Sequence, residues 1–313
     1  MLNNREILEQ YLSEADLEGR LTFRNDVSLK DVSSFKVGGN AEFGIYPNTK
    51  DELASLCALC RSISVPFIVV GNASNLVFDD SGYEGAVLFT NNINKISING
   101  NYISADCGLP LSRLCLSALE QELSGIEFAY GIPGTVGGAV FMNAGAYGGE
   151  FKDVICEVTY YDTEEDDFFT VKNEECSFGY RKSIFQDNNK IILSTTIKLS
   201  KSDKDQIHAL MHDYMQRRRD KQPLNYPSAG SVFKRPVGMF AGKLIEDSML
   251  KGYTVGGAQV SEKHAGFIIN IGNATASDIK ALVEHIVTVV KEKFSVDLEC
   301  EIRFVNNPSE VKT

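Results

Sequence analysis

Long apolar runs and positive charge are what this sequence lacks. No apolar stretch approaches the roughly 20 residues that a transmembrane helix needs, and the opening MLNNREILEQ has no apolar core of a secretory signal. The chain has 31 Lys and Arg against 42 Asp and Glu, a formal net charge of −11. Nucleic acid and anionic membranes attract clustered positive charge. The sequence therefore predicts a cytoplasmic protein that binds neither nucleic acid nor a membrane.

Cysteine and histidine are too scattered to predict a disulfide framework or a metal site. The seven cysteines are an odd number in 313 residues, so thiols in a reducing compartment fit better than disulfides. Cys57 and Cys60 share one face of an expected helix, and no second pair or nearby His completes a zinc set. We interpret both as core residues. His208 and His212 have the spacing of a zinc pair but lack the adjacent glutamate of a metalloprotease.

What the chain does contain is an ordinary globular composition, with 43% apolar and 23% charged residues, and a length that suits two or three domains. Strands and helices alternate first, and consecutive strands follow from about residue 84. Expected helices span 5–12, 51–63, 110–121, 204–221 and 276–294. Expected strands span 41–47, 66–71, 85–90, 95–98, 102–107, 154–162, 168–171, 190–199 and 296–304. In the last strand the charged residues alternate with apolar ones, which predicts that they face solvent.

The most unusual segment is 130–150, in which seven of 21 residues are glycine. Glycine suits positions where the backbone turns sharply or a ligand approaches the main chain. No Lys or Arg occurs between Arg113 and Lys152, so a pyrophosphate bound here would be held by backbone N–H groups. A floppy loop is the alternative, although embedded apolar residues such as Val136 and Val140 favour a packed element.

Three other segments are weaker candidates. Residues 71–75 follow an apolar run, and ligands often bind at the exit of a buried strand, but a plain turn is equally consistent. The Ser33–Gly39 segment is typical of an ordinary glycine turn. Residues 201–243 carry nine Lys and Arg against four Asp. This basic island is either an anion site or, at 217–221, a solvated helix face. The 238–243 segment is one residue short of a phosphate loop.

Seven short motifs follow one another along the chain. They are Gly71-Asn-Ala-Ser-Asn75, Gly131-Ile-Pro-Gly-Thr-Val-Gly-Gly-Ala139, Asn143-Ala-Gly-Ala-Tyr147, Phe178-Gly-Tyr-Arg-Lys-Ser183, Ser228-Ala-Gly-Ser-Val-Phe233, His264-Ala-Gly-Phe-Ile-Ile-Asn270 and Glu301-Ile-Arg-Phe304. Taken together, and in this order from about residue 30 to 304, they resemble the UDP-N-acetylenolpyruvoylglucosamine reductase family. Ile-Pro-Gly-Thr-Val-Gly-Gly followed by Asn-Ala-Gly is the most specific part. The spacing between Arg181 and Ser228 resembles the branch without an extra tyrosine-bearing loop.

The resemblance implies an FAD enzyme of bacterial cell-wall synthesis that uses NADPH to reduce the enolpyruvyl ether of UDP-N-acetylglucosamine to UDP-N-acetylmuramate. It implies an α+β fold, with a p-cresol methylhydroxylase-type FAD-binding domain of two α+β subdomains and a C-terminal α+β substrate-binding domain. The expected ranges are 1–83 and 84–200 for the FAD-binding subdomains, 201–305 for the substrate domain and 306–313 for a tail. A monomer or a weak oligomer is expected.

The resemblance also implies the roles of individual residues. Arg181 would stabilise negative charge that spreads into the substrate carboxylate, because a guanidinium binds carboxylate bidentately. Ser231 would protonate the carbanionic carbon, and Glu301 would assist near the same carbon. Tyr180, Arg218, Lys243 and Asn270 are the implied substrate-binding residues. The implied cofactor-binding residues are Gly71, Asn72, Ala73, Ser74, Asn75, Gly131, Ile132, Pro133, Gly134, Thr135, Gly137, Gly138, Ala139, Asn143, Gly145 and Ala146.

Histidine positions constrain how the cofactor is held. Many relatives on this flavin scaffold attach FAD covalently through histidine, but His208, His212, His264 and His285 all lie beyond the expected FAD region. We therefore expect noncovalent FAD and no metal. Two alternatives stay open. One is another oxidoreductase on the same scaffold, such as a flavin-dependent 2-hydroxy acid dehydrogenase. The other is a noncatalytic flavin-binding module.

Overall fold

The computed structural model describes residues 2–186 and 189–310, and the chain forms two compact units. Unit 1 contains residues up to Asn25 together with 43–72 and 85–216, and unit 2 contains 26–42, 73–84 and the chain from Arg217 onward. The units are thus interleaved along the sequence, whereas the expected domain ranges are consecutive. Those ranges stay a prediction, and Met1 and residues 311–313 of the expected tail lie outside the described residues.

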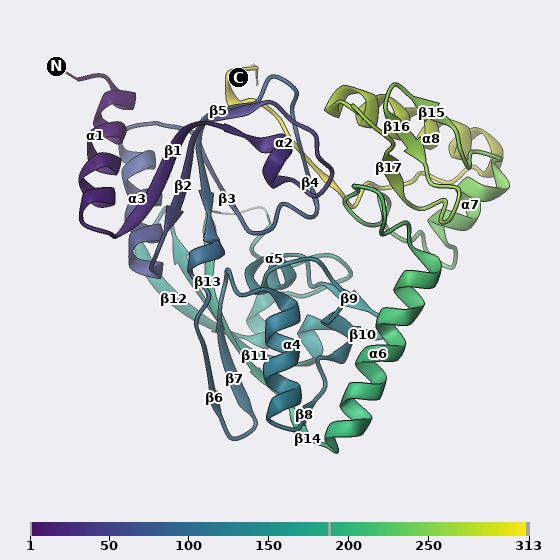
Figure 1. Cartoon of the computed structure of the whole chain (residues 1–313), viewed down its shortest axis with the longest axis horizontal. Helices are drawn as coiled ribbons and strands as arrows, with labels where there is room; N and C mark the ends of the chain where they lie inside the picture. The colour runs from purple at the N-terminus through teal and green to yellow at the C-terminus, as the bar shows by residue number, and fades with distance from the viewer. Residues whose placement is uncertain (1, 187–188, 311–313) are drawn as a thin grey trace. The chain divides into compact units, whose positions relative to one another are not determined.

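The first sheet has the order β1-β2-β5-β3, and β3 and β5 run parallel. Helices α1 and α3 lie beside it (Figure 1). Their apolar faces, which include Leu8 and Leu53, join Leu21 and Phe43 of the strands in one buried core. The elements are α1 (Asn4–Leu17), β1 (Leu21–Ser28), β2 (Asn40–Pro47), α3 (Lys50–Ser62), β3 (Phe67–Val70) and β5 (Tyr83–Phe89).

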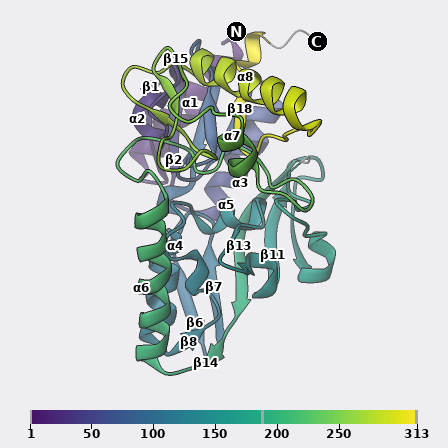
Figure 2. The same cartoon turned by 90° about the vertical axis from the view of Figure 1, so that its right-hand side faces the viewer.

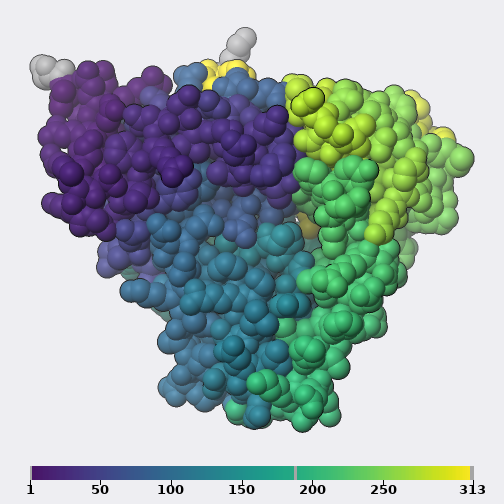
Figure 3. Space-filling model, viewed as in Figure 1, coloured from purple at the N-terminus to yellow at the C-terminus, as the bar shows by residue number. Residues whose placement is uncertain are grey.

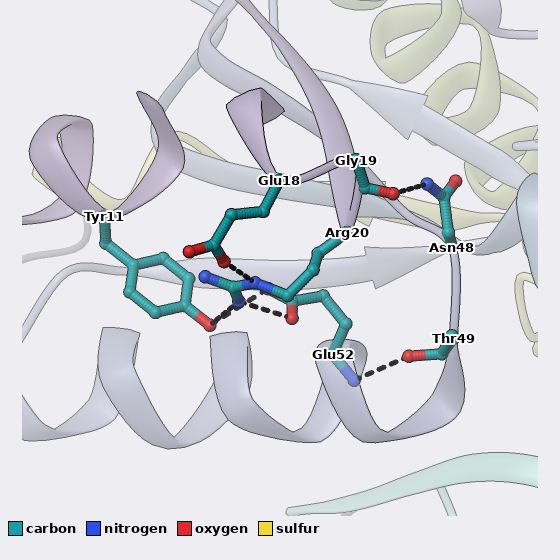
Figure 4. A network of polar contacts seen from close by, with 7 residues as sticks. All are labelled: Tyr11, Glu18, Gly19, Arg20, Asn48, Thr49 and Glu52. Carbon is teal, nitrogen blue, oxygen red and sulfur yellow. Dashed lines mark hydrogen bonds and ion pairs between the residues drawn. The ribbon is translucent and has the colours of Figure 1, made fainter. Parts of the chain in front are cut away.

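A hydrogen-bonded network fastens α1 to α3 (Figure 4). The Tyr11 hydroxyl donates to Glu52 Oε1 at 2.9 Å and accepts from Arg20 Nη1 at 3.0 Å. Arg20 also donates to Glu52 Oε2 at 2.7 Å and to Glu18 Oε2 at 2.6 Å. The Glu52 side chain is 7% exposed, so its charge is matched where water cannot reach it. The network therefore fixes the N-terminal helix on the sheet.

The second sheet of unit 1 has the order β12-β11-β13-β7-β6 with every neighbouring pair antiparallel. Helix α5 packs on β13 and β7, which places the glycine-rich segment against this sheet. The elements are β6 (Ile96–Asn99), β7 (Tyr102–Asp106), α4 (Leu111–Glu120), α5 (Val136–Phe141), β11 (Ile155–Asp162), β12 (Asp167–Lys172) and β13 (Lys190–Lys198). Short strand pairs join β8 (Leu123–Ser124) to β14 (Ser200–Lys201) and β9 (Gly145–Ala146) to β10 (Gly149–Glu150).

Unit 2 has its own buried core. Antiparallel strands β15-β16-β17 pack against α8, and α7 contacts α8 (Figure 2). Strand β4 pairs in parallel with β18, so residues 76–78 join the end of the chain. The elements are α2 (Leu29–Val32), β4 (Leu76–Phe78), α7 (Ala241–Asp247), β15 (Thr254–Val255), β16 (Ala258–Val260), β17 (Ile268–Asn270), α8 (Ala276–Phe294) and β18 (Arg303–Val305).

Helix α6 (Lys204–Lys221) leads from unit 1 into unit 2, and most of its side chains are exposed (Figure 3), whereas Ile207, Met211 and Arg218 are buried. The chain also forms short 3-10 helices: η1 (Thr90–Asn92), η2 (Glu127–Ala129), η3 (Phe151–Asp153), η4 (Asn173–Cys176) and η5 (Pro308–Glu310). Among the described helices, none is long and apolar enough to cross a membrane. The described residues contain no cluster of three or more His, Cys, Asp or Glu that could hold a metal ion.

The periodic expectations for 204–221 and 276–294 match α6 and α8 residue for residue. The expected strand 296–304 is wrong over most of its length, since a ladder forms only from Arg303. Alternation is still visible there, because Leu298 and Ile302 are buried while Asp297 and Glu299 are exposed. Before Arg303, the described segment makes one isolated bridge, from Cys300 to Phe233, instead of a ladder, so burial alternates without a regular strand.

Candidate active site

The glycine-rich segment is packed, which rules out the floppy loop. The Thr135 side chain caps α5 by accepting from the Gly138 N–H at 3.4 Å. The Val136 N–H donates to Leu109 and the Gly137 N–H donates to Cys107. A Cβ on Gly137 would lie 2.9 Å from the Cys107 Cβ, closer than atoms can pack. Glycine is therefore required here for packing against the chain itself.

Gly71 and Thr135 bring two of the sequence motifs together. A Cβ on Gly71 would lie 2.3 Å from Thr135 Oγ1, and Thr135 is buried. The missing side chain at residue 71 thus lets the exit of β3 approach the cap of α5. A backbone cradle of this kind suits a dinucleotide whose phosphates must approach the main chain.

The backbone N–H groups of residues 72–75 are available to donate hydrogen bonds to a ligand. Across residues 2–186 and 189–310, none of the backbone N–H groups of these four residues makes a hydrogen bond. Ala73 has a φ of +47°, a left-handed conformation that a non-glycine residue rarely adopts. Consecutive N–H groups around a left-handed residue form a concavity that suits a pyrophosphate. The segment therefore fits the flavin cofactor by its donor chemistry, with no nearby cation needed.

Asn143 holds the Phe178–Ser183 motif against the glycine-rich segment. It is fully buried, and its Nδ2 donates to the Gly179 carbonyl at 2.9 Å and to Glu150 Oε2 at 3.0 Å. Its Oδ1 accepts from the Lys152 N–H at 2.9 Å. Burial opposes the ionisation of Glu150, but hydrogen bonds from Lys152 and Asn143 and the charge of Arg181 lower its pKa overall. Asn143 is a predicted cofactor-binding residue, and in this structure its side chain orders the protein.

Arg181 adopts a left-handed backbone conformation with φ of +55°. Its Nη2 donates to the Gly145 carbonyl at 3.2 Å and its Nη1 to the Asn143 carbonyl at 3.5 Å. The guanidinium lies 5.1 Å from the centre of the Tyr180 ring. Backbone strain of this kind persists where the surroundings enforce it. The Phe178–Ser183 motif thus holds the partly exposed Arg181 guanidinium at the edge of the glycine-rich segment.

Ser231 and Glu301 lie on neighbouring extended segments of unit 2. The Glu301 N–H donates to the carbonyl of Val232, the residue after Ser231, at 2.7 Å. Phe233 and Cys300 form an isolated bridge next to this contact, and Ser231 bridges Phe267 on the other side. Ser231 is exposed and Glu301 is partly buried. The structure therefore joins, through their backbones, the segments that carry Ser231 and Glu301, two residues that are 70 positions apart in the sequence.

The expected substrate-binding residues of unit 2 differ in their surroundings. Arg218 is buried on α6, whereas Lys243 is exposed and pairs with Asp247 at 2.6 Å, which raises the pKa of Lys243. The Asn270 amide donates to the carbonyls of Phe35 and Lys36, and its oxygen accepts from the N–H groups of Gly272 and Ala274.

Local ion pairs weaken the basic island. Besides Lys243 with Asp247, Lys234 pairs with Glu299, which lies outside the island. Both acidic partners, Asp247 and Glu299, lie outside 201–243, so the net charge of that range does not include them. The sequence count thus overstates the positive potential available to an anion.

Ser34 and Asn75 organise unit 2 in ways that the sequence analysis missed. Ser34 Oγ donates to the Ser228 carbonyl at 2.8 Å, 194 positions away. Asn75 Nδ2 donates to the Glu301 carbonyl at 3.0 Å, 226 positions away. The sequence predicts an ordinary turn at Ser34 and a cofactor loop at Asn75. No spacing along the chain signals contacts of this range.

Comparison with known proteins agrees with these features. The model of the UDP-N-acetylenolpyruvoylglucosamine reductase C-terminal domain matches residues 222–305, and the model of the FAD binding domain matches residues 41–166. A UDP-N-acetylenolpyruvoylglucosamine reductase of Caldanaerobacter subterraneus subsp. tengcongensis is 47% identical over 300 residues, which cover 96% of this chain and 98% of that protein. One from Clostridium novyi is 46% identical over 287 residues, covering 92% and 93%.

A solved structure supports the same conclusion. The crystal structure of UDP-N-acetylenolpyruvylglucosamine reductase from Thermus caldophilus has a TM-score of 0.77 and 34% identity, and the match covers 91% of this chain and 98% of that one. The expected α+β FAD-binding fold with a C-terminal domain is confirmed, as is FAD as the cofactor. With near-complete coverage by relatives in both sequence and structure, the chain belongs to the UDP-N-acetylenolpyruvoylglucosamine reductase family.

Proposed function

We propose that this chain reduces UDP-N-acetyl-3-O-(1-carboxyvinyl)glucosamine to UDP-N-acetylmuramate with NADPH, using noncovalently bound FAD. Membership of the family supports an FAD-dependent reductase of this kind. The single observation that carries the mechanism is the main-chain hydrogen bond that places Glu301 beside the Ser231–Val232 segment. Ser231 and Glu301, whose side chains can donate or accept a proton, are thus carried by hydrogen-bonded backbone segments.

The cradle at Gly71 and Thr135, with the free N–H groups of 72–75, would hold the FAD pyrophosphate. Bound and reduced flavin supplies the hydride that adds to the terminal methylene of the enolpyruvyl group. The protein must then manage the electron pair that moves onto the adjacent carbon and its carboxylate.

Arg181 would bind this carboxylate and stabilise the charge that develops there. A guanidinium stays ionised and presents two parallel N–H groups, which match the two carboxylate oxygens. Its backbone is held by Gln186, whose Nε2 donates to the Arg181 carbonyl at 2.9 Å. An interaction that strengthens as charge develops lowers the barrier selectively.

Ser231 would donate its hydroxyl proton to the carbanionic carbon, which completes the reduction. A serine hydroxyl is a weak acid, so this step needs a strongly basic acceptor and fixed geometry. Gly230, with a φ of +77°, turns the chain just before Ser231, and the buried Val232 fixes it just after. Glu301 would assist by hydrogen bonding or by its electrostatic effect near the same carbon.

Tyr180, Arg218 and Lys243 are proposed to contact the UDP-sugar. Asn270 would act less directly, because its amide already holds the Phe35–Lys36 backbone. The remaining predicted cofactor residues of 131–146 would line the flavin. We also propose a cytoplasmic location and a monomeric or weakly associated state, which sedimentation analysis of the purified chain would measure.

The two half-reactions of Ser231→Ala test the mechanism. NADPH should still bleach the yellow enzyme, because hydride transfer into the flavin does not involve Ser231. Reoxidation by the enolpyruvyl substrate should fall by about 100-fold or more, since general acid catalysis contributes on the order of 10²–10⁴. Stopped-flow absorbance at the flavin band measures both steps.

Ser228→Ala is the matched control, because it deletes a hydroxyl from the same turn and keeps the carbonyl that accepts from Ser34. It should reoxidise at the wild-type rate. Wild-type reoxidation in Ser231→Ala would refute the serine assignment. A wild-type enzyme that binds FAD but turns over without a nucleotide sugar, or not at all, would refute the proposed function.

A further inference from the structure

Asn75 is the last residue of the 71–75 segment, which we propose holds the cofactor, and it directly precedes strand β4. Its side-chain amide and its carbonyl form hydrogen bonds with residues 301 and 303 near the end of the chain. Its Nδ2 donates to the Glu301 carbonyl at 3.0 Å. Its own carbonyl accepts from the Arg303 N–H at 2.9 Å. Two consecutive hydrogen bonds thus align residues 301–303 with Asn75 just before the parallel ladder between Leu76 and Arg303 begins.

The Glu301 peptide groups are consequently fixed on both sides. Its N–H is held by the Val232 carbonyl at 2.7 Å and its carbonyl by Asn75 at 3.0 Å. The backbone determines the direction of the Cα–Cβ bond, so these two contacts set where the carboxyl side chain starts. Loss of the Asn75 side chain would remove the contact at the Glu301 carbonyl, while the Glu301 N–H would still be held by Val232.

Ser34 connects the 71–75 segment to the turn that carries Ser231. Its Oγ donates to the Ser228 carbonyl at 2.8 Å, and its N–H lies 3.5 Å from the Ala73 carbonyl. Val232, next to Ser231, is fully buried and donates to Gly266. Residues 73–75 are therefore linked both to the turn that carries Ser231 and to the segment that carries Glu301.

We propose that Asn75 is a positioning residue that fixes Glu301 relative to Ser231, so that the segment proposed to hold the flavin phosphates also sets the geometry of proton delivery. This inference rests on the proposed function. The Asn75 side chain acts through Glu301, and the cofactor is held by the backbone N–H groups of the segment. Proton transfer is sensitive to displacements of about 1 Å, which can cost on the order of 100-fold in rate.

The test compares Asn75→Ala, Glu301→Gln and the double variant in the full chain. Asn75→Ala should slow reoxidation of the reduced enzyme by the enolpyruvyl substrate by about 10- to 100-fold at saturating substrate, with little change in KM. Bleaching by NADPH should be unchanged. In the Glu301→Gln background the same substitution should slow reoxidation less than about threefold, because residues that act through each other are not additive.

FAD affinity supplies a readout apart from turnover. Titration of the apoprotein, followed by quenching of flavin fluorescence, should give a dissociation constant for Asn75→Ala within about threefold of the wild type. Asn307→Ala is the matched control, because Asn307 lies just beyond β18 and its Oδ1 accepts from the N–H of Glu84, on β5, at 3.1 Å. This control should reoxidise at the wild-type rate.

Two results would overturn the inference while leaving the proposed function intact. One is weaker FAD binding with normal reoxidation at saturating FAD, which would make Asn75 a cofactor ligand. The other is a full additional loss in the Glu301→Gln background. If Asn75→Ala does not fold, Asn75→Asp has the same shape, cannot donate as a carboxylate, and should show the same slowing. A wild-type enzyme without activity would instead refute the proposed function.

Discussion

At the residue scale, two adjacent glycines of α5 allow packing and cofactor binding to be tested separately. A Cβ on Gly137 would lie 2.9 Å from the Cys107 Cβ, whereas a Cβ on Gly138 would meet its nearest atom, Thr135 Oγ1, at 3.6 Å. Gly137→Ala should destabilise the apoprotein by about 1–3 kcal/mol through overpacking. Gly138→Ala should be neutral or should stabilise it by up to about 1 kcal/mol through helix propensity.

Thermal unfolding of the two apoproteins measures this difference, and FAD titration gives the second half of the prediction. If the bare backbone at Gly138 serves the cofactor, Gly138→Ala should weaken FAD binding while its fold is intact. Equal destabilisation by both substitutions would contradict the packing argument. Unchanged FAD affinity in Gly138→Ala would remove residue 138 from the cofactor site.

Residue types are predictable from sequence where the reason is local, and unpredictable where it is not. The glycine density of 130–150 indicated close backbone approach, and Gly137 shows such an approach to Cys107. The pattern cannot say which partner is approached, because Cys107 lies outside the segment, and so does Gly71, which closely approaches Thr135. Arg181, Ser231 and Glu301 came from the family resemblance, and their roles stay predictions.

At the scale of elements, the start of α8 is held by acidic side chains. Asp278 accepts from the Thr275 N–H at 3.0 Å and from the Gly257 N–H at 3.1 Å, and the Thr275 hydroxyl completes a capping box. Asp80 accepts from Ala276 and Ser277. The hydrogen bond from Thr275 is the main reason that the pKa of Asp278 is lowered.

A lowered folded-state pKa means that this carboxylate stabilises the fold above the ordinary Asp pKa near 4, and that the stabilisation is lost as the pH falls through the folded value. Asp278→Asn should therefore cost about 1 kcal/mol at pH 7 and less at a pH well below the ordinary Asp pKa. Urea unfolding at both pH values measures the difference. Asp297→Asn, at an exposed ion pair with Lys291, is the control and should change little at either pH. A cost independent of pH would refute the electrostatic part.

The network that fastens α1 makes a second prediction for elements (Figure 4). Tyr11→Phe removes a hydroxyl that donates to Glu52 and accepts from Arg20, so it should cost about 1 kcal/mol of unfolding free energy. Tyr46→Phe deletes the same group from a ring stacked on Phe89, and within the described chain no hydrogen bond reaches that hydroxyl. It should be neutral in urea unfolding. Similar losses in both variants would show that the network contributes nothing.

Elements with a long, regular period were predictable, and short or irregular ones were not. Helices α6 and α8 match their expected ranges because many turns share one pattern. Helix α5, six residues long and rich in glycine, has little helix propensity and forms because Thr135 caps it and β13 supports it. The segment 296–302 alternates like a strand but has no continuous partner.

At the scale of the whole molecule, the order of motifs was predictable but their interleaving was not. Residues 26–42 and 73–84 belong to the same compact unit as the C-terminal part of the chain. Contacts such as Asn270 with Phe35, 235 positions apart, depend on the finished fold and leave no local pattern. A resemblance between ordered motifs conveys such contacts indirectly, because a whole family shares them.

The attachment of FAD is a property of the whole chain and gives the last prediction. The FAD binding domain match covers residues 41–166, and His208, His212, His264 and His285 all lie beyond it. The flavin should therefore be held by noncovalent contacts alone. Precipitation of the holoenzyme with trichloroacetic acid should leave a colourless pellet and all of the flavin in the supernatant.

Noncovalent binding also makes stability depend on free FAD. A ligand that binds only the folded state adds about 2.7 kcal/mol at 100 times its dissociation constant. The unfolding temperature of the holoenzyme, measured with a fluorescent dye, should thus rise steadily with added FAD. Bovine serum albumin at the same FAD concentrations is the control for effects of FAD on the dye. Yellow colour retained in the acid pellet, with an unfolding temperature that ignores added FAD, would show a covalent link. Since all four histidines lie beyond residues 41–166, that link would be sought first at another nucleophile within the FAD binding domain match.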